Sequence, residues 1–229
     1  MTTSCTRALC LAVFLLASLP AAGQDVLGQF LQTGVSLNYP VAPTYSHNFS
    51  LSQRYSFLDP VLETRGIRHL ELAHFSSFKW GASRSFGIGI LYRFREWFDG
   101  SRADELRITE QLNFVSEGGV VRTGHRLRAE QRIFSDIFRY RFRYRLALDG
   151  PLQGQSLNLK ELYWVGTLEG LFSAGEALRP LYGIRPSAYI GYLASEQFRI
   201  QIGAEYRQED LGRNNIPILF FFTSLILNL

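Results

Sequence analysis

The chain has 229 residues, of which 24 are Lys or Arg and 20 are Asp or Glu, so its net charge is +4 at pH 7. A charge this close to neutral does not favour nucleic acid as a partner, and the length fits a single domain. Aromatic residues make up 14 % of the chain, which is typical of β-strands and of membrane interfaces. The basic residues are almost all Arg, which pairs in a bidentate manner with carboxylates and phosphates.

The N-terminal residues have the composition of a secretory signal peptide. An Arg precedes a short apolar run, LCLAVFLLASL, which is followed by small residues. We expect a signal peptide over residues 1–23, with cleavage before Gln24, and a mature domain over residues 24–229. Cys5 and Cys10 both lie in the removed segment, so we expect no disulfide and no lipid anchor in the mature chain.

The next stretches are read from their alternation of polar and apolar side chains. Residues 24–38 (QDVLGQFLQTGVSLN) alternate weakly and are a possible strand; the alternative is that residues 24–45 form a periplasmic or weakly paired N-terminal segment. Beyond it, the alternation has a clear period of two, which predicts β-strands rather than helices. The predicted strands in this half cover residues 46–57, 68–80, 85–98 and 105–115.

The strongest alternation runs from His125 to Leu148 (HRLRAEQRIFSDIFRYRFRYRLAL). Its two runs are separated by Ser135-Asp136, so we predict a β-hairpin with the turn at these two residues. This turn would place Glu130 opposite Arg141. It would also put the charged side chains on one face and the Leu, Phe and Tyr side chains on the other.

Three further strands are predicted over residues 158–169, 185–193 and 198–207, and the chain ends in an apolar strand over residues 218–229. A long loop with two prolines nearby, FSAGEALRPLYG, is expected between the first two of these strands.

Eleven alternating segments of about nine to fourteen residues are typical of an outer-membrane β-barrel, whereas strands of a soluble sandwich are usually shorter. We therefore predict an all-β fold: a closed, antiparallel, up-and-down transmembrane β-barrel in the bacterial outer membrane. Such a barrel needs an even number of strands, so ten strands is our first choice and twelve our second. The expected surroundings are outer-membrane lipid and lipopolysaccharide, and we expect a monomer.

The central hairpin also carries a family resemblance. The sequence HRLRAEQR followed by RFRYRLAL resembles the pattern of a family of small bacterial outer-membrane β-barrels that is known only as a domain of unknown function. The strands that contain Glu169 and Arg185 fit the same pattern. The resemblance implies the fold and the location, and it implies no activity.

The charged faces of the predicted strands would meet inside the barrel. Arg is in excess there, and Glu residues are the expected counter-charges. Two interpretations stay open: a salt-bridge ladder that holds the wall together, or unpaired guanidinium groups that line a narrow anion-selective path or bind a small anion. The predicted lumen residues are Arg93, Arg95, Arg107, Arg126, Arg128, Arg132, Arg139, Arg141, Arg143 and Arg145, with Glu105, Glu130, Glu161, Glu169 and Glu205.

The strongest candidate for a catalytic motif is His74-Phe75-Ser76, whose His and Ser share a strand face beside Glu71. It is similar to the His-x-Ser of outer-membrane lipid A deacylases, in which His activates a Ser nucleophile. A lipid A-modifying hydrolase that uses His74 and Ser76 is therefore the alternative function. The spacing of the His residues predicts no metal site, and no nucleotide or cofactor motif is present in the sequence.

Overall fold

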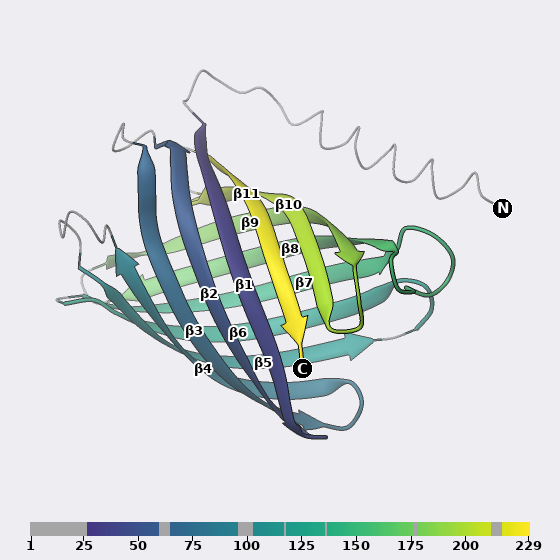
Figure 1. The fold of residues 1–229 in the computed structure, drawn as a ribbon. Helices are drawn as coiled ribbons and strands as arrows, with labels where there is room; N and C mark the ends of the chain where they lie inside the picture. The colour runs from purple at the N-terminus through teal and green to yellow at the C-terminus, as the bar shows by residue number, and fades with distance from the viewer. Residues whose placement is uncertain are drawn as a thin grey trace.

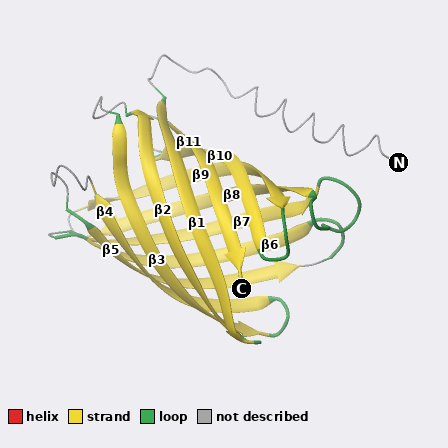
Figure 2. Ribbon diagram, in the orientation of Figure 1, coloured by secondary structure: helices red, strands yellow, loops and turns green. Residues whose placement is uncertain are grey.

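The structure is a computed structural model that describes residues 27–59, 65–95, 103–116, 118–135, 137–175, 178–211 and 217–229. The predicted signal peptide, with Cys5 and Cys10, lies outside these ranges. Within them, every regular element is a β-strand (Figure 2). The described part of the chain contains no helix that is both long enough and apolar enough to span a membrane.

Strands form where polar and apolar side chains alternate, because successive side chains of a strand point to opposite faces of the sheet. The strands are β1 (Gly28–Ala42), β2 (Tyr45–Leu58), β3 (Gly66–Trp80), β4 (Arg84–Arg95), β5 (Glu105–Ser116), β6 (Arg122–Ile133), β7 (Phe138–Pro151), β8 (Leu162–Gly175), β9 (Leu178–Leu193), β10 (Phe198–Glu209) and β11 (Ile218–Asn228).

These strands close into a single barrel in which each strand pairs with its neighbours in sequence and β1 pairs with β11 (Figure 1). All neighbouring pairs are antiparallel except β1 and β11, which run parallel from Gly28 opposite Ile218 to Asn38 opposite Asn228. The predictions of ten strands and of twelve strands are therefore wrong. An even count follows only if every pair is antiparallel, and the parallel closing pair removes that requirement.

The closing strand β1 comes from the weakly alternating segment, for which weak pairing was the alternative expectation. Residues 28–42 instead pair on both edges, with β11 on one side and β2 on the other. The alternation of β1 is weak because Thr33 interrupts its outer face and Gly34 its inner face, so neighbouring strands rather than its own pattern hold it in place. With eleven crossings, the chain enters β1 at one end of the barrel and leaves β11 at the other (Figure 1).

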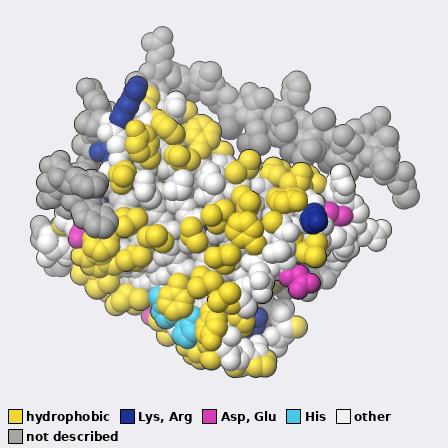
Figure 3. All heavy atoms as spheres, viewed as in Figure 1, with side chains coloured by type: hydrophobic (Ala, Val, Ile, Leu, Met, Phe, Trp, Pro, Cys, Tyr) yellow, Lys and Arg dark blue, Asp and Glu magenta, His cyan; other side chains and the backbone are white. Residues whose placement is uncertain are grey.

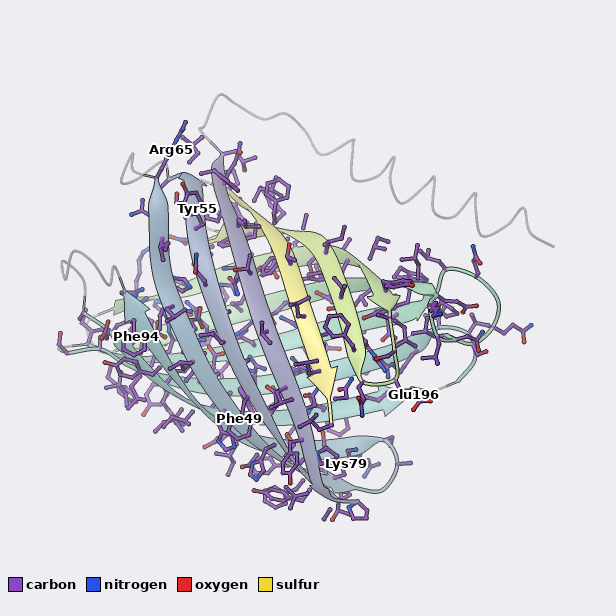
Figure 4. The ribbon with its side chains drawn as sticks, viewed as in Figure 1. Phe49, Tyr55, Arg65, Lys79, Phe94 and Glu196 are labelled. Carbon is purple, nitrogen blue, oxygen red and sulfur yellow. The ribbon has the colours of Figure 1, made fainter. Side chains whose placement is uncertain are left out.

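The two ends of the barrel have different connections. The short-turn end holds the turns at 43–44, 81–83 and 194–197, and the loop end holds the connections 59–65, 96–104 and 210–217. Figure 4 shows Arg65 and Phe94 at the loop end, with Lys79 and Glu196 at the short-turn end. There are exceptions at both ends: the connection 152–161 at the short-turn end is longer, and at the loop end β6 and β7 are joined by 134–137 and only two residues separate β8 from β9.

The long loop predicted after residue 171 is wrong. Strand β8 runs to Gly175 and β9 begins at Leu178, so strand pairing continues through most of this segment. The sheet extends here because β7 offers a partner to β8 up to Gly175. Pro180 lies near the start of β9, where a missing backbone donor is tolerated best.

The hairpin of β6 and β7 has the predicted register, with Glu130 opposite Arg141. Between β5 and β6, the sequence SEGG predicts a turn with Gly118-Gly119 at its tip, which would place Glu130 beside Arg107. The turn instead lies one residue later, so Glu130 pairs with Thr109 and Arg107 pairs with Arg132. A shift of two positions keeps every side chain on its predicted face, because the side-chain period of a strand is also two.

The outer face of the barrel is apolar. Large exposed hydrophobic side chains recur at every second position of the strands, for example Ile88, Ile90 and Tyr92 on β4. Figure 3 shows hydrophobic side chains spread over one side of this face. Glu110 on β5 is a departure, since it is exposed on this face between Ile88 and Ala129 of the neighbouring strands.

Inside the barrel, aromatic rings cover glycines of the next strand. A Cβ atom on Gly191 would lie 2.1 Å from Cζ of Tyr163, and one on Gly203 would lie 2.3 Å from Cδ1 of Tyr189. These rings fill lumen space toward the short-turn end and leave no room for a side chain on either glycine.

Candidate functional site

The candidate site is a cavity of about 650 Å³ in the lumen. Polar side chains form most of its lining, and twelve arginines dominate it. These are Arg54, Arg93, Arg95, Arg107, Arg128, Arg132, Arg139, Arg141, Arg143, Arg145, Arg185 and Arg207.

The hairpin of β6 and β7 brings like charges face to face. Its cross-strand pairs include Arg126 with Arg145, Arg128 with Arg143, and Arg132 with Arg139. Like charges in directly opposed positions destabilise a sheet. The hairpin therefore depends on carboxylates that β5, β6 and β8 contribute to the lumen.

Glu105, the first residue of β5, is fully buried and binds three arginines. The Nε of Arg132 lies 2.5 Å from Oε1, and Nη2 of Arg107 lies 2.7 Å from the same oxygen. Nη1 of Arg93 lies 2.9 Å from Oε2. This carboxylate thus joins β4, β5 and β6 near the loop end.

Glu130 is the second buried carboxylate, with 1 % of its surface exposed. Its Oε1 accepts a hydrogen bond from Nη1 of Arg143 at 2.9 Å, and Arg107 and Arg128 approach the same oxygen to 3.6 and 3.8 Å. The other oxygen, Oε2, is buried and has no hydrogen-bond partner. One carboxylate oxygen therefore interacts with three guanidinium groups while the second makes no hydrogen bond.

Glu169 on β8 is the third carboxylate that neutralises lumen arginines. Its Oε1 accepts a hydrogen bond of 2.6 Å from Nη2 of Arg143, and its Oε2 accepts one of 2.9 Å from Nε of Arg145. Arg143 thus bridges Glu130 and Glu169. Two further ion pairs, Arg207 with Glu205 and Arg185 with Glu209, lie on the opposite wall.

Five lumen-facing arginines have no carboxylate partner among the described residues, and one of them, Arg199 on β10, has a buried Nε without a hydrogen-bond partner. Arg54 donates to Oε1 of Gln32 at 3.0 Å, Arg126 to Oδ1 of Asn113 at 3.0 Å, and Arg141 to Oγ of Ser173 at 2.9 Å. Arg139 lines the cavity and has no ion pair there. The lumen therefore keeps positive charge that its own described carboxylates do not neutralise.

The structure adds lumen residues that the sequence analysis did not include. They are Arg54, Arg185, Arg207, Glu71 and Glu209. Arg54 and Arg207 stand on the polar faces of alternating strands, so the same face rule could have found them. In contrast, Glu161 is not part of the network: it accepts a hydrogen bond from the backbone of Asn158 in the connection before β8.

The His74 and Ser76 side chains lie on the outside of the barrel, as their shared strand parity predicts. The histidine beside Ser76 is His47 rather than His74: Oγ of Ser76 lies 3.3 Å from Nδ1 of His47, which lies 2.9 Å from Nε2 of His74. The hydroxyl of Tyr45 donates to Ser76 at 3.2 Å. Histidine side chains appear at the lower edge of the face in Figure 3.

Glu71 does not support a catalytic role for this outer cluster. It points into the lumen, where it binds Arg93 at 2.9 Å, so the interpretation that placed it beside His74 is wrong. Residues three apart on a strand lie on opposite faces. Across the described ranges, no group of three or more His, Cys, Asp or Glu side chains is arranged to hold a metal ion.

Comparison with known proteins gives one match. A family model with the description Protein of unknown function (DUF2490) matches residues 32–216, which is most of the chain. The match confirms the predicted resemblance to a family of unknown function. No curated protein matches the chain, and no solved structure matches it.

Proposed function

Since the chain belongs to this family of unknown function, its role must be derived from its own geometry, and we propose that it is an outer-membrane β-barrel whose lumen forms a narrow, anion-selective path. The surplus of guanidinium groups in the cavity is the observation that carries the proposal. Lipid and lipopolysaccharide would surround the outer face, and the barrel would act as a monomer.

The distribution of side chains supports a membrane location. Strands of 11 to 16 residues reach or exceed the nine to eleven or so that a tilted strand needs to cross a bilayer. Apolar side chains face outward and charged side chains face inward, the reverse of a soluble barrel with an apolar core. Closure leaves no exposed strand edge, as lipid requires.

The ion pairs support a path for anions rather than a purely structural ladder. A ladder that served only to hold the wall would need about as many carboxylates as guanidinium groups. Here Arg54, Arg126, Arg139 and Arg141 lack carboxylate partners among the described residues, and three of them line the cavity. A ring of Arg side chains raises the local concentration of anions and excludes cations.

Reversal potentials in a planar bilayer test this proposal. With a KCl gradient across the membrane, we expect the current through the purified barrel to be carried mainly by chloride. Replacing both Arg139 and Arg141 with Gln should reduce this preference, whereas Arg122→Gln, at an exposed pair with Asp149 outside the cavity, should leave it unchanged. Cation selectivity, or the absence of any current, would overturn the proposal.

A further inference from the structure

We propose that the seam where β1 meets β11 carries a binding subsite for a phosphate group, formed by Arg54, Arg207 and Gln32 around the ring of Phe220. The inference deepens the proposed anion path and rests on it for access to the lumen. The ligand would be a small phosphorylated anion, bound in the lumen at the seam between β1 and β11.

The seam brings together side chains from four strands. Arg54 comes from β2, Gln32 from β1, Phe220 from β11 and Arg207 from β10. Gln32 lies opposite Arg54 in the antiparallel pair and opposite Phe222 in the parallel pair. The β1–β2 pair places Gln32 beside Arg54, and only the closure of the barrel brings these two residues next to Phe220 and Arg207, because β1 and β11 lie at opposite ends of the sequence.

The ring of Phe220 holds two guanidinium groups. The Cζ atom of Arg207 lies 3.7 Å from the ring centroid, and Cζ of Arg54 lies 4.5 Å from it. Phe220 is 1 % exposed and stacks on Phe30 with a centroid separation of 5.2 Å. A buried aromatic platform of this kind orients the cations and leaves their edges free for hydrogen bonding.

Arg54 is left with donors to spare. Its Nη2 donates to Gln32, but its Nε is buried and has no hydrogen-bond partner. A buried donor without a partner is costly, and a guanidinium without a carboxylate is more so. By contrast, Arg143 binds both Glu130 and Glu169. Arg54 therefore lacks a counter-charge and a hydrogen-bond acceptor for its Nε, and an oxyanion would supply both.

The charge balance favours phosphate over a single carboxylate. Arg207 is paired with Glu205, yet Arg54 has no counter-charge, and other lumen arginines without one share the cavity. A phosphate group carries between one and two negative charges near neutral pH and has several acceptor oxygens, so it can bind Arg54 and Arg207 together. The cavity of about 650 Å³ has room for a small organic group attached to the phosphate.

Binding of inorganic phosphate to the full barrel in detergent tests the subsite. The measurements are the shift of the thermal unfolding midpoint and titration calorimetry, with chloride used to match ionic strength. We expect Arg54→Gln to weaken phosphate binding about tenfold, because a charge-assisted bidentate contact is lost. Arg126→Gln is the matched control: it removes the same charge from another arginine without a carboxylate, outside the cavity lining, and should change the affinity less than about twofold.

Arg54→Lys keeps the charge but loses the planar fork, so it should also weaken binding; it decides the question if Arg54→Gln does not fold. Equal losses in Arg54→Gln and Arg126→Gln would overturn the subsite and leave a generally basic lumen. An anion-selective barrel that does not bind phosphate would also overturn the subsite while the proposed path stands. Phosphate binding that depends on Arg54 in a barrel without conductance would support the subsite and refute the path.

Discussion

At the scale of single residues, Glu130 has the most demanding surroundings in the lumen. It is buried, it faces Arg143, Arg107 and Arg128, and it lies opposite Arg141 across the hairpin. Neutralising it would leave these guanidinium groups facing one another with fewer counter-charges. Its two neighbouring carboxylates, Glu105 and Glu169, already bind arginines of their own.

We expect Glu130→Gln to lower the free energy of unfolding by about 3 kcal/mol, because removing one partner of a buried ionic network leaves like charges uncompensated. The measurement is the urea midpoint of the folded barrel in lipid vesicles. Ala129→Val, on the apolar outer face of the same strand, is the control and should change little. A neutral Glu130→Gln with a larger chloride current would show that water screens these charges in an open channel.

Glu110 offers a second test at this scale, since it is a carboxylate on the outer face in the middle of β5. If lipid surrounds this face, Glu110→Leu should raise the free energy of unfolding in vesicles by about 1 kcal/mol, and with it the urea midpoint, because a charged or polar group in the hydrocarbon region is unfavourable. Ile108→Leu, two positions away on the same face, is the matched control. A lower midpoint for Glu110→Leu would argue against lipid contact at this position.

At the scale of elements, the geometry of the outer cluster on β2 and β3 favours a structural role for these side chains over a catalytic one. Ser76 is close to His47, but the carboxylate nearest in sequence, Glu71, binds Arg93 on the other side of the wall. A serine hydrolase needs a base that is itself held in orientation by a third group. In the outer cluster the same atom, Nδ1 of His47, faces both Ser76 and His74, so His74 does not orient His47 from its second ring nitrogen as a triad requires. The hydrogen bonds of the cluster, including the one from Tyr45, link strands.

We therefore expect Ser76→Ala and His74→Ala to leave the acylation of lipid A unchanged. Mass spectrometry of lipid A from cells with and without each variant checks this. Phe49→Leu, on the same face of β2, controls for disturbance of the outer wall. Loss of a deacylated lipid A species in the Ser76→Ala strain alone would establish the hydrolase alternative.

The parallel pair of β1 and β11 is the element that determines the strand count. Val35 lies directly opposite Leu225, so cysteines at these two positions should be roughly 5 Å apart at Cα and should form a disulfide. The only native cysteines are Cys5 and Cys10, in the predicted signal peptide. Gel mobility under oxidising and reducing conditions would report the cross-link.

The control pair is Leu51→Cys with Leu225→Cys. Leu51 pairs with Val35 from the other side, so it lies two strands from Leu225, roughly 10 Å away and out of reach of a disulfide. In a ten-stranded barrel without β1, strands β2 and β11 would be neighbours. Cross-linking of the control pair instead of the Val35 pair would therefore favour ten strands.

At the scale of the whole molecule, the closed barrel with an apolar outside and a charged inside predicts a location. We expect the protein to fractionate with the outer membrane and to migrate differently on a detergent gel before and after heating, because a closed barrel resists unfolding by detergent until it is heated. A periplasmic soluble protein from the same cells serves as the fractionation control. Recovery of the chain in the soluble periplasmic fraction would contradict the membrane proposal.

Alternation by itself determined which face each side chain occupies. The period of two is a local property of a strand, so Arg128, Arg143 and Glu169 could be assigned to the inside from sequence alone. The predicted turn between the two runs of the hairpin likewise led to the pairing of Glu130 with Arg141 that β6 and β7 have. Even where the predicted turn between β5 and β6 was one residue off, the faces survived, because the register moved by two.

Only the tertiary structure decided what depends on contacts between distant segments. The parallel pairing of Gly28 with Ile218, and with it the eleven-strand count, follows from closure of the whole sheet and has no local signature. The same closure places Arg54 and Arg207 on Phe220, and the pairing of β2 with β3 places His47 beside Ser76. The alternation of a strand specifies the face on which each side chain lies. The residues that a side chain contacts depend instead on the register between strands, on whether it reaches a diagonal neighbour, and on the order of the strands around the barrel.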